Sequence, residues 1–466
     1  MLICADARCI PLADNSVQCA VTSPPYWGLR KYAGAQELVW GGAADCAHEW
    51  GETIPVIMIA GLHRLPANET GGTKKFTAMG SHGCYCQKCG AWRGAFGLEP
   101  TVEMYVAHTV EVLREVRRVL RDDGVLFLNL GDSYAGSMKG VSGDKAYGGA
   151  KQKTVRGSIG LPVQEWGALK PKDLCLIPMR VALAAQADGW WVRSAIIWAK
   201  PNPMPESVTD RPTDAYEHIL MLTKSSRYFW DAEAVKEGGT GRNWLAAGGN
   251  LVGAGLHKAH DGYRDNGAGR GEEGQGSGRN LRNVWTFATQ PYSGAHFATF
   301  PEELPRRCIL AATSAKGACR FCGAPWERVV KSATQMNAES WKGSQFDTGK
   351  TAEHQGNRMQ VRTGKNEQSG IRTMEGFNAR WDEKEESGVE LPHSIGWRPT
   401  CECRGQHGRT VACVVLDPFG GSGTTGRVAT ELNRRGVLLD LAYAHEYGPL
   451  AKKRNTNVQR MLNVEC

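Results

Sequence analysis

Two short stretches of this sequence combine residue types that suit chemistry with a backbone that is held rigid. The first, Ser23-Pro24-Pro25-Tyr26, follows the apolar run at 17–21. Proline fixes its own φ angle, donates no hydrogen bond and pushes the preceding residue into an extended conformation. The stretch is therefore a rigid turn at the end of a strand. Such a turn either holds its hydroxyl, carbonyl and aromatic groups toward a ligand or is purely structural.

The second stretch places three glycines, Gly420, Gly421 and Gly423, between a valine-rich strand and a helix that begins near Thr424. Glycines there let the backbone turn sharply and approach a ligand without Cβ interference. No Gly-Lys-Ser/Thr follows, and the G-x-G-x-x-G pattern of pyrophosphate binding is absent. A nucleoside that carries a small group or an amino acid, such as S-adenosylmethionine, suits this turn better than a diphosphate. A tight turn without a ligand is the alternative.

Together, the two stretches resemble the motifs of the amino-methyltransferases of DNA, which modify an exocyclic nitrogen of a base. That family pairs an S/D/N-P-P-Y/F motif with an F-x-G-x-G motif, and the matching residues here are 23–26 and 419–423. The catalytic motif comes first and the cofactor motif last, an order similar to that of the permuted class called beta. The resemblance covers most of the chain outside three interrupting segments. It implies S-adenosylmethionine as the methyl donor and double-stranded DNA as the partner.

The resemblance also implies a role for each residue of the first motif. The Ser23 hydroxyl and the Pro24 carbonyl would accept hydrogen bonds from the target amine, and the two prolines would fix the direction of that carbonyl. These acceptors would stabilise the positive charge that develops on nitrogen during attack. Tyr26 would stack on a base flipped out of the duplex, with Trp27 either an outer wall or a core residue. The expected catalytic set is Ser23, Pro24, Pro25 and Tyr26.

By the same resemblance, a larger group of residues would bind the cofactor. Phe300 would lie against the adenine ring, with Asp6 near it, and Asp440 ends the next strand, where its carboxylate would accept hydrogen bonds from a ribose diol. The complete expected set is Asp6, Phe300, Asp417, Phe419, Gly420, Gly421, Ser422, Gly423, Thr424, Thr425 and Asp440.

The residue type at the first position of the catalytic motif indicates which base nitrogen is methylated. Serine at the first motif position resembles the cytosine-N4 enzymes, whereas aspartate or asparagine resembles the adenine-N6 enzymes, so cytosine is expected and adenine stays the alternative. Methylation at carbon 5 of cytosine needs a cysteine nucleophile in a Pro-Cys motif, and no cysteine follows a proline in this chain. A non-catalytic zinc-containing protein that binds nucleic acid on a methyltransferase fold is the rival of another class. RNA is a further alternative substrate.

The cysteines predict metal binding. There are 15 of them, an odd number, in a chain whose first residues lack the pattern of an export signal. This argues against a disulfide framework and makes metal ligation the first hypothesis. C-x-x-C-G steps are typical of zinc knuckles. Two structural zinc sites without a catalytic role are expected, similar to those of phage-type and prophage-type methyltransferases; free buried thiols are the alternative. The predicted ligands are Cys46, His48, Cys86 and Cys89 in the first site and Cys319, Cys322, Cys401 and Cys403 in the second, with Cys84 as a spare.

Bulk properties set wider limits. The 466 residues are 41% hydrophobic, enough for a sizeable core, and no apolar run approaches the length that crosses a bilayer. A formal net charge of +8 permits a polyanionic partner without requiring one. The expected location is the cytoplasm of a bacterial or phage-infected cell. A homodimer and a cognate restriction endonuclease are both left open.

The two motifs must be held by a folded domain, and the hydrophobic pattern of the sequence indicates its fold class. Apolar residues recur at helical spacing from Val102 to Leu120; the sequence "DDG" at 122–124 is predicted to end that helix, and "VLFLNL" at 125–130 reads as a buried strand. Strands and helices alternate in the same way elsewhere. This alternation predicts an α/β fold with a doubly wound, mostly parallel sheet, of the Rossmann-like methyltransferase type implied by the resemblance, carrying two zinc-binding insertions.

The predicted domain organisation follows from the three interruptions. The catalytic half comprises residues 1–38 and 97–235, and the cofactor-binding half comprises residues 281–316 and 409–466. The zinc-binding insertions are residues 39–96 and 317–408, the latter with a long polar loop, and the Gly-rich segment 236–280 is a candidate for target recognition. Asp132 either faces the active site or caps a strand end. Lys200, Arg211 and His218 either frame a DNA-facing cleft or belong to a solvated loop.

Overall fold

Apolar runs that are buried on both faces build the central sheet of the protein. The structure, a computed structural model, describes residues 1–28, 37–54, 83–135, 169–170, 172–206, 208–238, 278–290, 300–331, 393–403, 409–444, 449, 451–453 and 455. The chain divides into two compact units, the first of which comprises Met1–Val235, Leu281–Glu327 and Pro399–Cys466. The sheet belongs to the first unit. Its eight strands run in the order β1 (Leu2–Ile3), β17 (Arg435–Leu439), β16 (Val414–Asp417), β2 (Val17–Thr22), β6 (Leu120–Leu130), β8 (Tyr216–Thr223), β7 (Trp191–Ala199) and β11 (Val284–Thr286).

The sheet is mostly parallel, as the alternation of elements predicted. Only β8 runs antiparallel to its neighbours, β6 and β7. Strands from the two ends of the chain are neighbours, because β1 pairs with β17 and β2 pairs with β16. The carboxyl ends of β1, β17, β16, β2, β6 and β7 therefore share one edge of the sheet, which we call the carboxyl edge.

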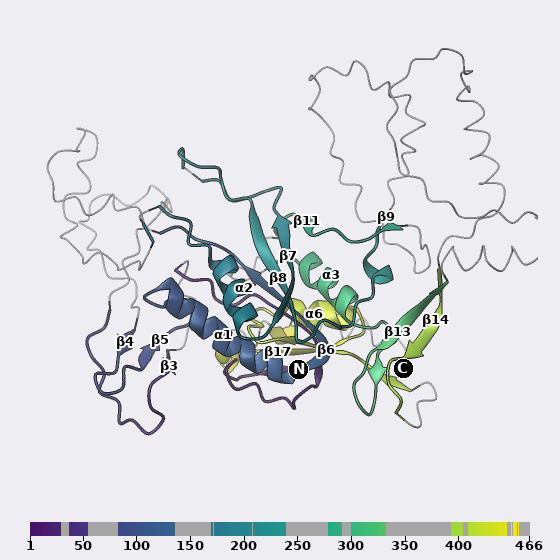
Figure 1. The fold of residues 1–466 in the computed structure, drawn as a ribbon, viewed down its shortest axis with the longest axis horizontal. Coiled ribbons are helices and arrows are strands. Elements are labelled where there is room, and N and C mark those ends of the chain that lie inside the picture. Colours follow the sequence, from purple (N-terminus) through teal and green to yellow (C-terminus); the bar gives the residue numbers. More distant parts are fainter. Residues whose placement is uncertain are drawn as a thin grey trace, which may run out of the picture. The chain divides into compact units, whose positions relative to one another are not determined.

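Two hydrophobic clusters cover the two faces of the sheet, which explains the continuous apolar runs. Along β6, Leu126 and Leu128 pack with α1 (Val102–Val119) and α2 (Ile177–Ala187). Their neighbours Val125 and Phe127 face the other way and pack with α3 (Glu303–Ala312) and α6 (Thr424–Glu431). Every side chain of the strand segment from Val125 to Leu130 is consequently buried. Figure 1 shows these helices flanking the strands.

Helix α1 has the expected apolar stripe, but its predicted end is wrong. It begins at the N-cap Thr101, whose side chain accepts a hydrogen bond from the Met104 N–H, and ends at Val119. Leu120 is already extended, and residues 122–124 lie inside β6 instead of terminating the helix. The pairing of β6 with β2 shifts register between Val17 and Cys19, so the strand absorbs these polar residues as an irregularity.

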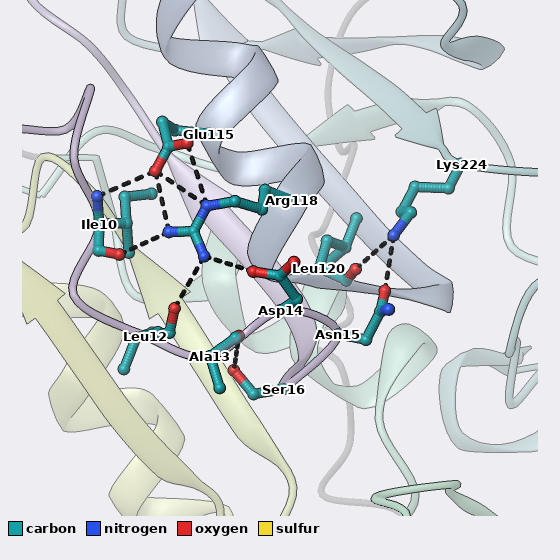
Figure 2. Close-up of polar contacts among 10 residues, drawn as sticks. All are labelled: Ile10, Leu12, Ala13, Asp14, Asn15, Ser16, Glu115, Arg118, Leu120 and Lys224. Atoms are coloured by element: carbon teal, nitrogen blue, oxygen red, sulfur yellow. Dashed lines mark hydrogen bonds and ion pairs between the residues drawn. The ribbon is translucent and has the colours of Figure 1, made fainter.

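Polar contacts fix the loop before β2 to the end of α1 (Figure 2). The Arg118 guanidinium donates to the carbonyl oxygens of Ile10 and Leu12 and to the carboxylates of Asp14 and Glu115. Lys224, which follows β8, donates to the Asn15 side chain at 2.7 Å. A polar cavity of about 300 Å³ lies here, lined by Asp14, Asn15, Arg114, Arg117, Arg118, Asp188 and Lys224. Asp14 and Asn15 precede β2, and Lys224 follows the antiparallel strand β8, so the cavity lies at the edge opposite the carboxyl edge. Its other lining residues come from the carboxyl ends of α1 and α2.

Short sheets and turns complete the described elements. In the first unit, β3 (Leu38–Trp40), β5 (Trp92–Gly94) and β4 (Cys84–Tyr85) form a three-stranded sheet, β12 (Ala318–Cys319) pairs with β15 (Thr410–Val411), and η2 (Glu233–Val235) and η4 (Leu441–Ala444) are 3-10 turns. The second unit comprises Lys236–Asn280 and Arg328–Arg398. It contains the pair β9 (Glu237–Gly238) and β10 (Gly278–Arg279); β14 (His393–Pro399) pairs with β13 (Trp326–Lys331). Among the described residues, no helix has the length and apolar character needed to cross a membrane.

Candidate active site

The two sequence motifs lie side by side at the carboxyl edge. Residues 23–28, the proline corner, follow β2, and residues 418–423, the glycine corner, follow β16. These strands are parallel neighbours, paired through Val415 with Cys19 and Leu416 with Ala20. The Thr22 hydroxyl donates to Asp417 Oδ1 at 2.7 Å, across 395 residues of sequence. Residues near both ends of the chain therefore form one site.

The Asp417 side chain connects the two corners by hydrogen bonds. It is buried, and besides Thr22 it accepts hydrogen bonds from the Phe419 N–H at 3.1 Å and from the Thr425 hydroxyl at 2.6 Å. Burial raises the pKa of Asp417 to about 6, although these hydrogen bonds act in the opposite direction. The described contacts of Asp417 are thus with the protein itself, and a contact with the cofactor stays a prediction.

The glycine corner is a tight turn with open space above it. The Gly423 N–H donates to the Gly420 carbonyl at 2.8 Å, and Gly421 and Gly423 have φ angles of +44° and +86°. A Cβ atom on Gly423 would lie 2.8 Å from the Asn455 side chain, so glycine is required there for packing as well as for conformation. Among the described residues, a Cβ on Gly421 would meet only the Phe419 carbonyl, at 3.9 Å. The backbone at Gly421 is therefore accessible to a ligand.

Asp440 completes this side of the site. One carboxylate oxygen accepts from the Gly421 N–H at 3.0 Å and the other from the Ala442 N–H at 2.8 Å. Each oxygen keeps a further lone pair, so the carboxylate can still accept hydrogen bonds from the hydroxyls of a ribose. Burial raises the pKa of Asp440. Ser422 and Thr424 are themselves buried in the turn.

The remaining predicted cofactor residues have different surroundings. Asp6 follows β1 at the same edge, where it forms an ion pair with Arg8 at 2.7 Å. The Arg8 guanidinium also lies 4.2 Å from the centre of the Trp40 ring. Phe300 packs against the hydrophobic cluster that contains α3. The structure thus places Asp6 at the carboxyl edge and Phe300 beside α3.

Neighbouring elements hold the proline corner. The Tyr105 hydroxyl, on α1, donates to the Pro25 carbonyl at 2.9 Å. Trp27 is buried in the core, and its indole N–H donates to the Glu99 carbonyl at 2.9 Å. Of the two roles considered for Trp27, the core residue is the one observed. Within the described part of the chain the Pro24 carbonyl makes no hydrogen bond, so it is available as an acceptor.

A chain of hydrogen bonds leads from Ser23 into the protein. The Ser23 hydroxyl donates to the Tyr26 hydroxyl at 3.1 Å, which donates to Glu217 Oε2 at 2.6 Å. Asn129 Nδ2 donates to both Tyr26 and Glu217, at 2.7 and 2.8 Å, and Lys200 forms an ion pair with the other Glu217 oxygen. Because the only hydrogen of Ser23 is used in this chain, its lone pairs are free to accept hydrogen bonds from an amine.

Sequence patterns did not point to Asn129 or Glu217. Asn129 is 2% exposed, and its Oδ1 atom has no hydrogen-bond partner among the described residues. A polar residue inside the run "VLFLNL" was the available signal, since a buried amide requires partners. Of the weaker candidates, Lys200 reaches this cluster. Asp132 instead accepts hydrogen bonds from the Ser133 and Ile177 N–H groups, which is a capping role.

Both predicted sets of metal ligands are assembled. Within each set, the four ligand atoms all lie within 4.8 Å of one another. The first set is Cys46, His48, Cys86 and Cys89, and the second is Cys319, Cys322, Cys401 and Cys403. Four donors at such spacing, three thiols with an imidazole or four thiols, fit a tetrahedral zinc ion. Burial raises the pKa of Cys86, but hydrogen bonds from backbone N–H groups and from His48 outweigh it and lower the pKa to about 5. Cys84 lies outside the first set.

Comparison with known proteins identifies the family. A family model described as DNA methylase, for N6 and N4 enzymes, matches residues 17–319 and 412–453, a range that includes both corners of the site. The chain belongs to the N6/N4 DNA methylase family. It is an S-adenosylmethionine-dependent DNA methyltransferase.

Individual relatives agree with this assignment. The type II methyltransferase M.Cfr9I of Citrobacter freundii is 35% identical over 302 residues, which cover 65% of this chain and 68% of the relative. The type II methyltransferase M.SmaI of Serratia marcescens is 31% identical over 318 residues, covering 68% and 76%. Among solved structures, the cytosine-N4-specific PvuII DNA methyltransferase aligns with a TM-score of 0.41 and 13% identity, covering 100% of this chain and 93% of that chain.

Proposed function

We propose that this DNA methylase is site-specific and methylates the exocyclic N4 amine of a cytosine flipped out of double-stranded DNA. The hydrogen bond between Thr22 and Asp417 carries the proposal, because it fixes the proline corner beside the glycine corner. The serine at position 23 favours cytosine over adenine, since the family resemblance associates serine in this motif with N4 enzymes. The adenine-N6 amine is the competing target.

In this proposal the proline corner binds and activates the target amine. An exocyclic amine is a poor nucleophile, because its lone pair is delocalised into the ring. Ser23 Oγ and the Pro24 carbonyl accept its two hydrogens, which favours a pyramidal nitrogen and stabilises the positive charge that forms during attack. Asn129 Oδ1, which has no partner in the part of the chain that the structure describes, is proposed as a further acceptor. Tyr26 and Pro25 hold the groups in position, with the Tyr26 ring as the stacking surface.

The glycine corner is the proposed donor site. Gly420, Gly421 and Ser422 form the cradle, and Asp440 is placed to accept the ribose hydroxyls. When bound, S-adenosylmethionine supplies a methyl group that leaves sulfur for nitrogen without a covalent enzyme intermediate, and the amine loses one proton. The other predicted members of the site, Asp6, Phe300, Asp417, Phe419, Gly423, Thr424 and Thr425, either shape this cradle or contact the donor.

Further features belong to the same proposal. The chain order of the two corners supports membership of the permuted beta class, and the two cysteine sets support two structural zinc ions in insertions of the phage type. The type II methyltransferases among the relatives support a restriction-modification setting in the cytoplasm. Segment 236–280, the candidate for target recognition, lies almost entirely outside the described residues.

Nucleoside analysis tests the proposed target. Duplex DNA is incubated with the purified protein and methyl-labelled S-adenosylmethionine, digested to nucleosides and analysed by mass spectrometry. We expect N4-methylcytosine; N6-methyladenine alone would refute the choice of base but not the activity. RNA is assayed in parallel, and label in RNA without label in DNA would refute the substrate.

A pair of variants separates catalysis from binding. Ser23→Ala removes one acceptor and should lower methyl transfer about tenfold or more, as the loss of one charge-stabilising hydrogen bond does. Ser225→Ala is the control, because Ser225 lies after β8 at the opposite edge, where its hydroxyl bonds to backbone groups of Asp122 and Arg227. Equal activity of the two variants would remove Ser23 from the mechanism.

A further inference from the structure

The segment that follows the first cysteine set contacts both corners of the candidate active site. The Phe96 ring stacks on the Phe419 ring of the glycine corner, with centroids 5.7 Å apart, and on the Tyr105 ring of α1, at 5.3 Å. Tyr105 in turn holds the Pro25 carbonyl. Phe96 thus lies between the elements that carry the two corners.

The next residues lie directly against the proline corner. The Gly28 N–H donates to the Gly97 carbonyl at 2.9 Å, and Trp27 donates to the Glu99 carbonyl. Gly97 has a φ angle of +89°, and a Cβ atom there would approach Pro25 Cβ to 3.0 Å. Only glycine permits this approach without strain, so the position of residues 97–99 determines where the proline corner can lie.

A buried carboxyl group holds this segment in shape. Glu99 is fully buried; its Oε2 atom accepts the Gly97 N–H at 2.9 Å, and its Oε1 atom lies 3.0 Å from Nδ1 of His108 on α1. Burial raises the pKa of Glu99. A buried acid costs free energy that an apolar residue would avoid. No apolar side chain could bind the Gly97 N–H and His108 together, which accounts for an acid at this place.

His108 connects this carboxyl group to the first cysteine segment. Its ring is stacked on Trp40, with centroids 4.1 Å apart, and on Trp92, at 5.4 Å. The two tryptophans are paired across β3 and β5. Those strands belong to the sheet whose third strand, β4, leads into the ligand Cys86. An unbroken set of contacts therefore runs from the cysteine segment through His108 and Glu99 to the proline corner.

We propose that Glu99 and His108 are positioning residues for methyl transfer, which set the proline corner relative to the donor site. The first cysteine segment is in this view part of the catalytic scaffold, not a separate attachment. The inference rests on the proposed role of Ser23 and Pro24. The glycine corner is held by its own bonds to Asp440 and Asp417, so loss of the Glu99 contacts should misplace the amine acceptors and leave the donor site intact.

Single-turnover kinetics on duplex DNA, with separate titration of S-adenosylmethionine, test the inference. Glu99→Ala should lower the rate of methyl transfer about tenfold or more and change the dissociation constant of the donor less than twofold. Glu99→Gln should restore the rate to within about threefold of wild type, because its amide can accept the Gly97 N–H and donate to His108. Glu103→Ala, an exposed carboxylate at the start of α1, is the matched control and should match wild type.

Several outcomes would overturn the inference while the wild type remains active. They are an unchanged rate in Glu99→Ala, an equal loss in Glu99→Gln, or a loss of donor affinity as large as the loss of rate. If Glu99→Ala does not fold, His108→Phe decides, because phenylalanine keeps the stacking on the two tryptophans but cannot pair with Glu99. It should lower the rate at least about threefold with donor affinity retained; a wild-type rate would refute the pair. Inactivity of the wild type would instead refute the proposed function.

Discussion

The Tyr26 hydroxyl donates a hydrogen bond of 2.6 Å to Glu217, and this contact sets the direction of the hydrogen bond between Ser23 and Tyr26. The Glu217 carboxylate, ion-paired with Lys200, can only accept. Tyr26 must therefore give its hydrogen to Glu217 and accept from Ser23. Ser23 consequently presents lone pairs, not a hydrogen, to a target amine. A residue from β8 thus determines whether the motif serine can act as an acceptor.

Replacing this carboxylate by an amide should slow catalysis. In Glu217→Gln the amide can donate to Tyr26, so the direction of the chain is no longer imposed, and Lys200 loses its ion pair. We expect the single-turnover rate of methyl transfer to fall about tenfold, equivalent to about 1.4 kcal/mol, with unchanged donor affinity. Glu206→Gln is the control, since Glu206 pairs with Arg211 in the loop between β7 and β8. Equal rates for the two variants would show that Glu217 has no such influence.

A side chain at Gly421 should oppose donor binding. The space above Gly421 is open, so Gly421→Ala would place its methyl group where the donor is proposed to lie, besides the cost of about 1 kcal/mol for a left-handed residue. We expect the dissociation constant for S-adenosylmethionine, measured by calorimetry, to rise about tenfold, with the KM for DNA nearly unchanged. Gly41→Ala has a similar backbone cost and open surroundings away from the site. Equal donor affinity in both variants would contradict the assignment.

The buried Asp417 side chain predicts a pH dependence of stability. Its pKa is raised from 3.8 to about 6 in the folded protein. Between pH 4 and 6 the folded protein therefore retains a proton that the unfolded chain has lost, and the free energy of unfolding falls as pH rises. The full effect, reached above pH 6, is about 3 kcal/mol. Stability at low pH benefits from this group, in contrast to a carboxylate whose pKa is lowered.

Asp417→Asn isolates that contribution. Asparagine can accept from Thr22 and Phe419 but does not titrate, so the difference between variant and wild type removes the effects of all other groups. Urea unfolding at pH 4, 5, 6 and 7 should show the variant gaining up to about 3 kcal/mol relative to wild type across this range. A constant difference between the two proteins would mean that the pKa of Asp417 is not raised.

Local patterns were sufficient to predict the scaffold. The spacing from Val102 to Val116 predicted α1, and the run at 125–130 predicted a strand buried on both faces, because these features depend on side-chain periodicity alone. The end of α1 was missed, since "DDG" is a typical terminator but here lies in an irregularity of β6, between Leu120 and Val125, both of which pair with β2. A tertiary contact overrode a local preference.

The supporting residues of the site could not be predicted in this way. Glu217 reaches Tyr26 across 191 positions, and Asn129 reaches it across 103. Glu99 and His108 are near in sequence, but His108 lies on the buried stripe of α1 among apolar residues, and its partners Trp40 and Trp92 come from another segment. A single sequence shows that such polar residues need partners without showing which strand supplies them.

Metal content offers a test of both cysteine sets with matched controls. Cys86 and Cys84 lie near each other and are equally buried, but only Cys86 belongs to the first set. In protein purified without chelator, Cys86→Ser should lose about one of two zinc equivalents and unfold at a lower temperature, because structural zinc contributes directly to folding. Cys84→Ser should keep both ions.

The second set is tested in the same way. Cys319→Ser should lose about one zinc equivalent, like Cys86→Ser. Cys413 is buried but lies outside the set, so Cys413→Ser should keep both ions. Wild-type protein without zinc would refute both sites. A metal loss in Cys84→Ser as large as that in Cys86→Ser would refute the ligand assignment of the first site, because Cys84 is not among the four residues whose ligand atoms lie within 4.8 Å of one another.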